Sequence, residues 1–227
     1  MFVGHYGVSL AIKKKETNIP LWLLFIAVQW VDILFCLFVL TGVESLRIIP
    51  GFTAYNAFDL HFMPYTHSLL GALLCSLVFG FAAAYFVRPR SAYKKTALWL
   101  FVAAFSHFLL DLPMHVKDLL LMPGSEMKFG FGLWNHFYLS MAVELCVFAI
   151  GLWIFGVRNR RYPFWILVVL CVTMLVANPF MPPPQSATEF ALSALTAYGL
   201  LAALAWWAER SQTTVLKNAA VGNTDPA

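Results

Sequence analysis

The chain has 227 residues, of which 61% are hydrophobic and only 11% are charged. Because a soluble domain carries about 25% charged residues, this composition excludes an ordinary soluble protein and predicts an integral membrane protein. The net charge is only +4, and no nucleic-acid partner is expected. The four cysteines lie inside apolar runs without a C-x-x-C spacing, which favours small buried side chains over a redox motif.

Apolar segments of about 20 residues, the length that crosses a bilayer, follow one another along the chain. They cover approximately residues 20–40, 64–87, 96–112, 132–155, 163–176 and 187–207. The sequence therefore predicts an all-α polytopic membrane bundle of about six spanning helices, with a polar loop at 41–63. Residues 1–208 are expected to form one domain, with a metal site within residues 1–140, and residues 209–227 a disordered cytoplasmic tail.

Basic residues gather on one side of the predicted bundle. The side that holds both ends of the chain carries twelve, namely Lys13, Lys14, Lys15, Arg88, Arg90, Lys94, Lys95, Arg158, Arg160, Arg161, Arg210 and Lys217. The opposite side carries three, namely Arg47, Lys117 and Lys128. Since cytoplasmic loops are rich in Lys and Arg, this asymmetry predicts that both termini are cytoplasmic.

The third apolar segment ends in three ionisable residues, His107, Asp111 and His115, each four positions apart. Residues at this spacing share a helix face. Imidazole and carboxylate groups are good ligands for a borderline cation such as zinc, and burying them without a partner is expensive. The spacing indicates a metal or proton site. Pro113 is expected to bend or end the helix just after Asp111.

Asp32 lies in the middle of the first apolar segment, about 18 Å from its start at 1.5 Å per residue. His107 is about equally deep when counted from Lys95, so the two side chains are expected to meet. His5 precedes a run of lysines. A surface helix would leave His5 at the membrane face, whereas a short half-helix inserted into the bundle would lift it by about 12 Å towards Asp32. The half-helix is favoured, because Gly4 and Gly7 would permit close packing.

Other polar residues fall on the outer side, at the ends of the second and fourth segments. His61, His67 and His136 belong to this set, with Trp134 and Asn135 beside the last of them. Two interpretations stay open for the loop acids Asp59, Asp118 and Glu126, which are either solvated charges or functional groups. Glu144, inside the fourth segment, has no assigned role.

Several short motifs occur in a recognisable order. They are Gly4-His5-Tyr6, Asp32 in the first segment, Thr66-His67-Ser68-Leu69-Leu70, Ser106-His107-x-x-x-Asp111, and Gly130-Phe131-Gly132-Leu133-Trp134. Over residues 1–155 the chain resembles the bacterial membrane-bound metal-dependent hydrolases of the inner membrane. The resemblance implies His5, Asp32, His67, His107 and Asp111 as metal ligands and Ser68 as a substrate or supporting contact. A single Asp stands where this family often has a P-D-x-D pair.

The resulting hypothesis is a metal-dependent hydrolase in a bacterial inner membrane. A divalent ion, zinc with manganese or iron as alternatives, would activate water, with Asp111 or Asp59 as the general base. The expected substrate is an ester or phosphoester, such as a lipid or lipid-linked molecule. The residues expected to line the substrate site are His61, His115, Trp134, Asn135 and His136. A transporter for protons or divalent cations, using the same His and Asp residues, is the alternative, and the carboxylates argue against a haem site.

Overall fold

The computed structural model describes residues 1–87, 92–158 and 160–222. Arg88 and Arg90 of the predicted basic turn lie outside these ranges, as do residues 223–227 of the predicted tail. The helices are α1 (Gly4–Lys15), α2 (Leu21–Val28), α3 (Trp30–Leu40), α4 (Leu69–Val87), α5 (Tyr93–Met114), α6 (Phe137–Phe155), α7 (Tyr162–Ala177) and α8 (Ala187–Gly222). Short 3₁₀ turns cover Leu133–Asn135 and Asn178–Phe180.

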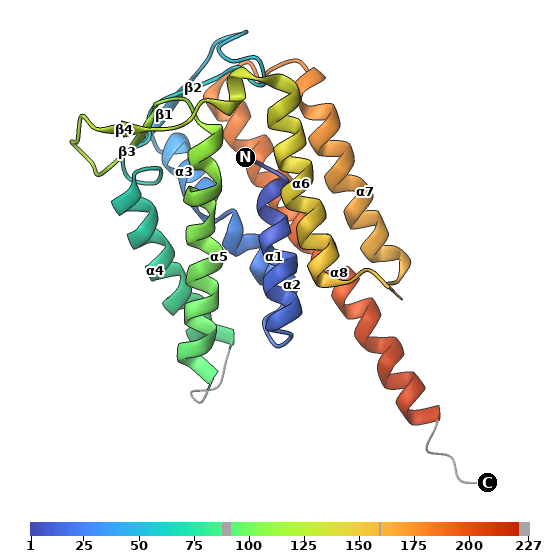
Figure 1. The fold of residues 1–227 in the computed structure, drawn as a ribbon. Helices are drawn as coiled ribbons and strands as arrows, with labels where there is room; N and C mark the ends of the chain where they lie inside the picture. Colours follow the sequence, from blue (N-terminus) through green and yellow to red (C-terminus); the bar gives the residue numbers. More distant parts are fainter. Residues whose placement is uncertain (88–91, 159, 223–227) are drawn as a thin grey trace.

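The long helices form a bundle whose connections alternate between two ends (Figure 1). Among the described residues, α4, α5, α6, α8 and the α7 region are long and apolar enough to cross a membrane. The bent pair α2 and α3 passes the same test as one broken segment and makes a sixth. This architecture confirms the predicted all-α membrane bundle.

The first spanning segment is broken, whereas the sequence predicted one continuous helix. Helices α2 and α3 meet at Gln29 with a bend of 58°. Gln29 is fully buried, and its side-chain amide donates a hydrogen bond to the carbonyl of Phe2 at 3.0 Å. This contact comes from a distant part of the chain, so the apolar run itself gave no sign of it. The bend places Asp32 in the first turn of a new helix.

Helix α1 is the predicted half-helix. It lies inside the bundle between α5 and α6, with the amino terminus in the half nearer the hairpins and its carboxyl-terminal end towards the end from which α8 projects (Figure 1). His5 is fully buried. A Cβ at Gly7 would lie 2.3 Å from the carbonyl oxygen of Val147, so only glycine permits this approach to α6. The close packing expected of Gly7 is therefore observed.

Two small antiparallel hairpins cover the opposite end of the bundle (Figure 1). Strand β1 (Ser45–Ile48) pairs with β2 (Phe58–Phe62), and β3 (Leu119–Leu120) pairs with β4 (Lys128–Phe129). The sequence predicted only a loop at 41–63, because strands of two to five residues leave little periodicity to read.

Helices α4 and α5 also differ from the sequence expectation at their outer ends. The carboxylate of Glu44 accepts hydrogen bonds from the backbone amides of Tyr65 and Thr66, which keeps the preceding turn out of the helix, so α4 begins at Leu69. Helix α5 continues through Pro113 to Met114, where an end near Asp111 was predicted. A proline this close to a helix end disturbs few backbone bonds.

Helix α8 extends beyond the predicted end of the sixth span near residue 207. Glu209, where the polar tail was expected to start, lies within this helix. Its carboxylate forms an ion pair with Lys13 of α1 and accepts a hydrogen bond from the backbone amide of Leu21, at 2.8 Å. Glu209 therefore joins α8 to the turn between α1 and α2, and it satisfies one free amide at the start of α2.

Candidate metal centre

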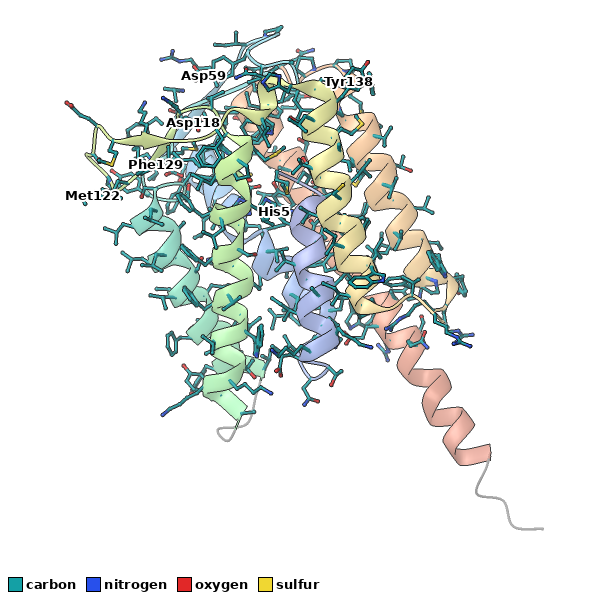
Figure 2. The ribbon with its side chains drawn as sticks, viewed as in Figure 1. His5, Asp59, Asp118, Met122, Phe129 and Tyr138 are labelled. Carbon is teal, nitrogen blue, oxygen red and sulfur yellow. The ribbon has the colours of Figure 1, made fainter. Side chains whose placement is uncertain are left out.

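Six polar side chains from four parts of the chain converge inside the outer half of the bundle. They are His5 of α1, Asp32 of α3, His67 of the turn before α4, His107 and Asp111 of α5, and His115, which follows α5 directly. All are buried except Asp32, whose side chain is 21% exposed. Figure 2 shows His5 within the bundle, below the hairpin residues Asp59 and Asp118.

His107 lies at the centre of this cluster. Its Nε2 atom is 3.0 Å from Oδ2 of Asp111 and 3.4 Å from Oδ1 of Asp32. The Nε2 atom of His67 is 3.3 Å from the same oxygen of Asp32. His107 therefore contacts both carboxylates, which lie on different helices.

Asp111 gathers the other members of the cluster. Its Oδ1 atom is 3.3 Å from Nε2 of His5 and accepts a hydrogen bond from the amino group of Met1. Its Oδ2 atom is 3.5 Å from Nε2 of His115. The rings of His5 and His107 stack with their centroids 4.1 Å apart. Among the described residues, neither ring nitrogen of His5 nor Nε2 of His107 has a hydrogen-bond partner.

Three of these histidines are held in place through Nδ1. For His107 the partner is the carbonyl oxygen of Val28 at 2.8 Å, and for His115 it is the carboxylate of Asp118 at 3.0 Å. For His67 it is the hydroxyl of Thr66 at 2.9 Å. Carbonyl and carboxylate oxygens only accept hydrogen bonds, so Nδ1 carries the hydrogen. In the neutral ring, the lone pair on Nε2 then faces the cluster.

Glu44 stands behind Thr66 and completes this support. It is buried, and its Oε2 atom accepts the hydroxyl hydrogen of Thr66 at 2.6 Å. The oxygen of Thr66 is therefore an acceptor towards His67. Outer partners of this kind orient metal-binding histidines and raise their basicity.

Tyr198 of α8 donates a hydrogen bond from its hydroxyl to Oδ2 of Asp32 at 2.9 Å. The sequence reasoning did not identify Tyr198, because one tyrosine in a long apolar segment resembles any aromatic residue of a membrane helix. Glu44 was also not identified from the sequence, because it lies 22 residues from its partner Thr66. Asp118, interpreted as either a solvated charge or a functional group, is the partner of His115.

His115 lies at the edge of the cluster between the carboxylates of Asp118 and Asp111. Burial alone lowers the pKa of this imidazole, but the carboxylates of Asp118 and Asp111 outweigh burial and raise the pKa above its usual value. The neighbouring ring of Trp134, whose centroid is 4.2 Å from that of His115, closes the cluster on this side.

The donor set fits a divalent metal ion. Two groups, His5 with His107 and Asp111, and Asp32 with His67 and His107, have ligand atoms within 4.8 Å of one another. Tetrahedral zinc with bonds of about 2.0–2.1 Å holds its ligand atoms about 3.3–3.4 Å apart. The distances of 3.3 Å for His5 to Asp111 and for His67 to Asp32 match this spacing. A cation held between the Nε2 atoms and the carboxylate oxygens would satisfy both sets of atoms.

The other predicted site residues divide into two sets. Trp134 is buried beside His115, and Ser68 is buried next to His67, where its hydroxyl accepts the amide hydrogen of Gly71. The remaining four lie on the outer surface or in the hairpins, and among the described residues they form no hydrogen bond or ion pair with the cluster: Asp59, His61, Asn135 and His136. Asp59 faces Arg47 across the β1–β2 pair, at the hairpin end of the molecule (Figure 2).

Glu144, which had no assigned role, anchors the amino-terminal segment. It is buried in α6, and its Oε2 atom accepts hydrogen bonds from the backbone amides of Phe2 and Gly4 at 2.9 and 3.2 Å. Its Oε1 atom accepts a hydrogen bond from the hydroxyl of Tyr55 at 3.4 Å. A carboxylate at the start of α1 also interacts favourably with the helix dipole. Glu144 thus fixes the helix that carries His5.

A sequence model described as YdjM inner membrane protein matches residues 6–184, which is more than half of the chain. Its description gives a membrane location and names no activity. No curated protein and no solved structure matches the chain. The match supports the bacterial inner membrane family expected from the motifs, and the chemistry must be argued from the cluster itself.

Proposed function

The chain belongs to the YdjM inner membrane protein family, and we propose that it is a metal-dependent hydrolase embedded in the bacterial inner membrane. The proposed ligands are His5, Asp32, His67, His107 and Asp111. Zinc is the first candidate, and manganese and iron are the alternatives, because nitrogen and carboxylate donors suit all three. The observation that carries the proposal is the convergence of imidazole Nε2 atoms on two carboxylates, Asp111, which is buried, and Asp32, which is 21% exposed.

The proposed reaction is hydrolysis of an ester or phosphoester. A bound divalent ion would lower the pKa of a water molecule and polarise the carbonyl or phosphoryl oxygen. The water oxygen would form a bond to carbon or phosphorus, the bond to the leaving oxygen would break, and that oxygen would take a proton. Asp111 touches three imidazoles and is proposed as a ligand. Asp59, beside Arg47 in the hairpin, has no contact that supports a role as the general base.

The position of the cluster favours a substrate that approaches from the membrane or its outer surface. His115 and Trp134 form the wall towards the hairpins, and Ser68 lies beside His67. A lipid or lipid-linked ester or phosphoester is the proposed substrate class. We also propose that the end bearing Lys13, Lys94 and Arg161 faces the cytoplasm, following the positive-inside rule. The carboxyl-terminal end of α8 then lies on the cytoplasmic side, whereas Met1 lies inside the bundle.

A proton is the other cation that satisfies this geometry. An imidazolium at His107 would face both Asp111 and Asp32, as in a relay of a proton-coupled transporter. Metal content separates the two functions. We would purify the whole protein, dialyse it, and measure its zinc, manganese and iron by elemental analysis. A structural or catalytic site predicts about one or two tightly held ions per chain.

Matched variants decide whether the ion belongs to the cluster. His107→Ala should lose the metal, while His61→Ala, which removes an exposed histidine of β2, should retain it. His67→Gln gives a smaller change of volume in case His107→Ala does not fold. A preparation without metal that also takes up none on reloading would rule out the hydrolase and favour the proton relay. If metal binds, hydrolysis of lipid phosphoesters and esters is the next measurement.

A further inference from the structure

A cavity of about 310 Å³ lies at the end of the bundle opposite the hairpins. Its walls come from the ends of α1, α6, α7 and α8, and its charged and aromatic lining residues include Lys13, Lys14, Phe155, Arg160, Phe164 and Glu209. This volume is at the lower end of the range for small-ligand pockets, about 300–1,000 Å³. The cavity is separate from the histidine cluster, since none of the cluster residues lines it.

Lys13 and Glu209 satisfy each other and the nearby backbone. The ammonium of Lys13 donates to the carbonyls of Thr17 at 2.6 Å and Ile19 at 2.7 Å, and forms the ion pair with Glu209. The second carboxylate oxygen of Glu209 accepts the amide hydrogen of Leu21. The one acidic residue of the cavity wall is thus neutralised inside the protein.

Lys14 and Arg160 supply positive charge that no acidic residue in the described part of the chain neutralises. The guanidinium of Arg160 lies 3.9 Å from the ring centroid of Phe155 and 5.7 Å from that of Phe164, and its Nε atom donates to the carbonyl of Gly156 at 3.1 Å. These contacts fix the plane of the group. In the part of the chain that the structure describes, neither Arg160 nor the exposed Lys14 forms an ion pair.

We propose that this cavity binds the phosphoryl group of an anionic ligand, with the headgroup of an anionic phospholipid as its source. A fixed guanidinium matches phosphate oxygens with two parallel hydrogen bonds, and Lys14 adds a second charge. The rings of Tyr162 and Trp207, 5.7 Å apart on neighbouring α7 and α8, resemble the aromatic belt at a membrane surface. Basic pockets between membrane helices on the cytoplasmic side bind such headgroups.

Native mass spectrometry of the whole protein in detergent tests this proposal. Phosphatidylglycerol, phosphatidylcholine and inorganic phosphate would be titrated separately. Phosphatidylglycerol should bind more tightly than phosphatidylcholine, and Lys14→Gln/Arg160→Gln should weaken it about 25-fold, a factor of about five for each basic side chain. Tight binding of inorganic phosphate with the same dependence on the two residues would support the phosphoryl site and assign it to a soluble ligand.

The matched control is Lys15→Gln/Lys94→Gln, which removes the same charge from the same end of the bundle outside the cavity. It should leave phosphatidylglycerol binding within about twofold of the original protein, since exposed charges away from the site are screened. Arg160→Lys keeps the charge, loses the planar fork and should weaken binding less than Arg160→Gln. An equal loss in both double variants, or no preference for phosphatidylglycerol over phosphatidylcholine, would overturn the proposal.

Discussion

The Nδ1 atom of His107 on α5 donates a hydrogen bond to the carbonyl of Val28, the last residue of α2, at 2.8 Å. The last carbonyls of a helix have no partner within it, so the break after Val28 provides the acceptor. The same break begins the helix that carries Asp32. One bend at Gln29 therefore orients the central imidazole and positions a carboxylate that faces it.

Thr66→Val should weaken metal binding about 10–100-fold, the usual effect of losing an outer hydrogen bond to a ligating histidine. The valine side chain cannot accept a hydrogen bond from His67 or donate one to Glu44. It should also lower the free energy of unfolding by about 1–3 kcal/mol, because Glu44 is left with one buried oxygen unpaired. Chelator competition and thermal unfolding measure the two effects.

Thr66→Ser is the control for Thr66→Val, because serine keeps the hydroxyl group. It should restore metal affinity to near the original value. If Thr66→Ser is as weak as Thr66→Val, the shape of the side chain rather than the relay to Glu44 controls His67.

Tyr198→Phe should reduce metal affinity by about 10–100-fold with little loss of fold, because it removes only the hydroxyl that donates to Asp32. Tyr162→Phe makes the same chemical change at an exposed position of α7 and should have no effect. Equal affinities for the two variants, measured by chelator competition, would show that Tyr198 does not support the ion.

Gly7→Ala should destabilise the protein by about 1–3 kcal/mol, the usual range for overpacking. The added methyl would lie 2.3 Å from the carbonyl oxygen of Val147 and push α1 away from α6. Because His5 is on α1, the variant should also retain less metal. Gly199→Ala on α8, where nothing lies within 4 Å, is the matched control and should unfold at the temperature of the original protein.

Glu144→Ala should loosen the amino-terminal half-helix. It leaves the amides of Phe2 and Gly4 and the hydroxyl of Tyr55 without their acceptor, at about 1–3 kcal/mol for each buried group. Hydrogen exchange over residues 1–12 should become faster. Glu126→Ala, in an exposed loop, should leave exchange in this segment unchanged. Unchanged exchange in Glu144→Ala would mean that packing against α6 is sufficient to hold α1.

The sequence predicted much of the cluster because its chemistry stands out from the apolar background. His107 and Asp111 share a helix face, and counting the rise per residue placed Asp32 and His107 at the same depth. Gly4 and Gly7 favoured insertion of the half-helix that carries His5. These predictions depend on local spacing and on the cost of burying charge, and neither requires knowledge of which helices are neighbours.

The features that were missed depend on contacts between distant segments. The first span bends at Gln29, whose side chain is hydrogen-bonded to the carbonyl of Phe2. Glu44, just before β1, accepts hydrogen bonds from the turn around Thr66. Tyr198 comes from α8, which contributes no predicted ligand. His115 was expected to face the substrate and lies against Asp111, because α5 continues through Pro113 and keeps the four-residue spacing in register.

The attachment of α1 to α6 has a consequence for the order in which the protein assembles. Phe2 and Glu144 are 142 residues apart, and Gly7 and Gly151 are in backbone contact. Translation adds roughly 5–20 residues per second. Residues 1–15 cannot form these contacts until α6 has been synthesised. The cluster around His107 therefore remains without His5 until four later membrane segments have emerged.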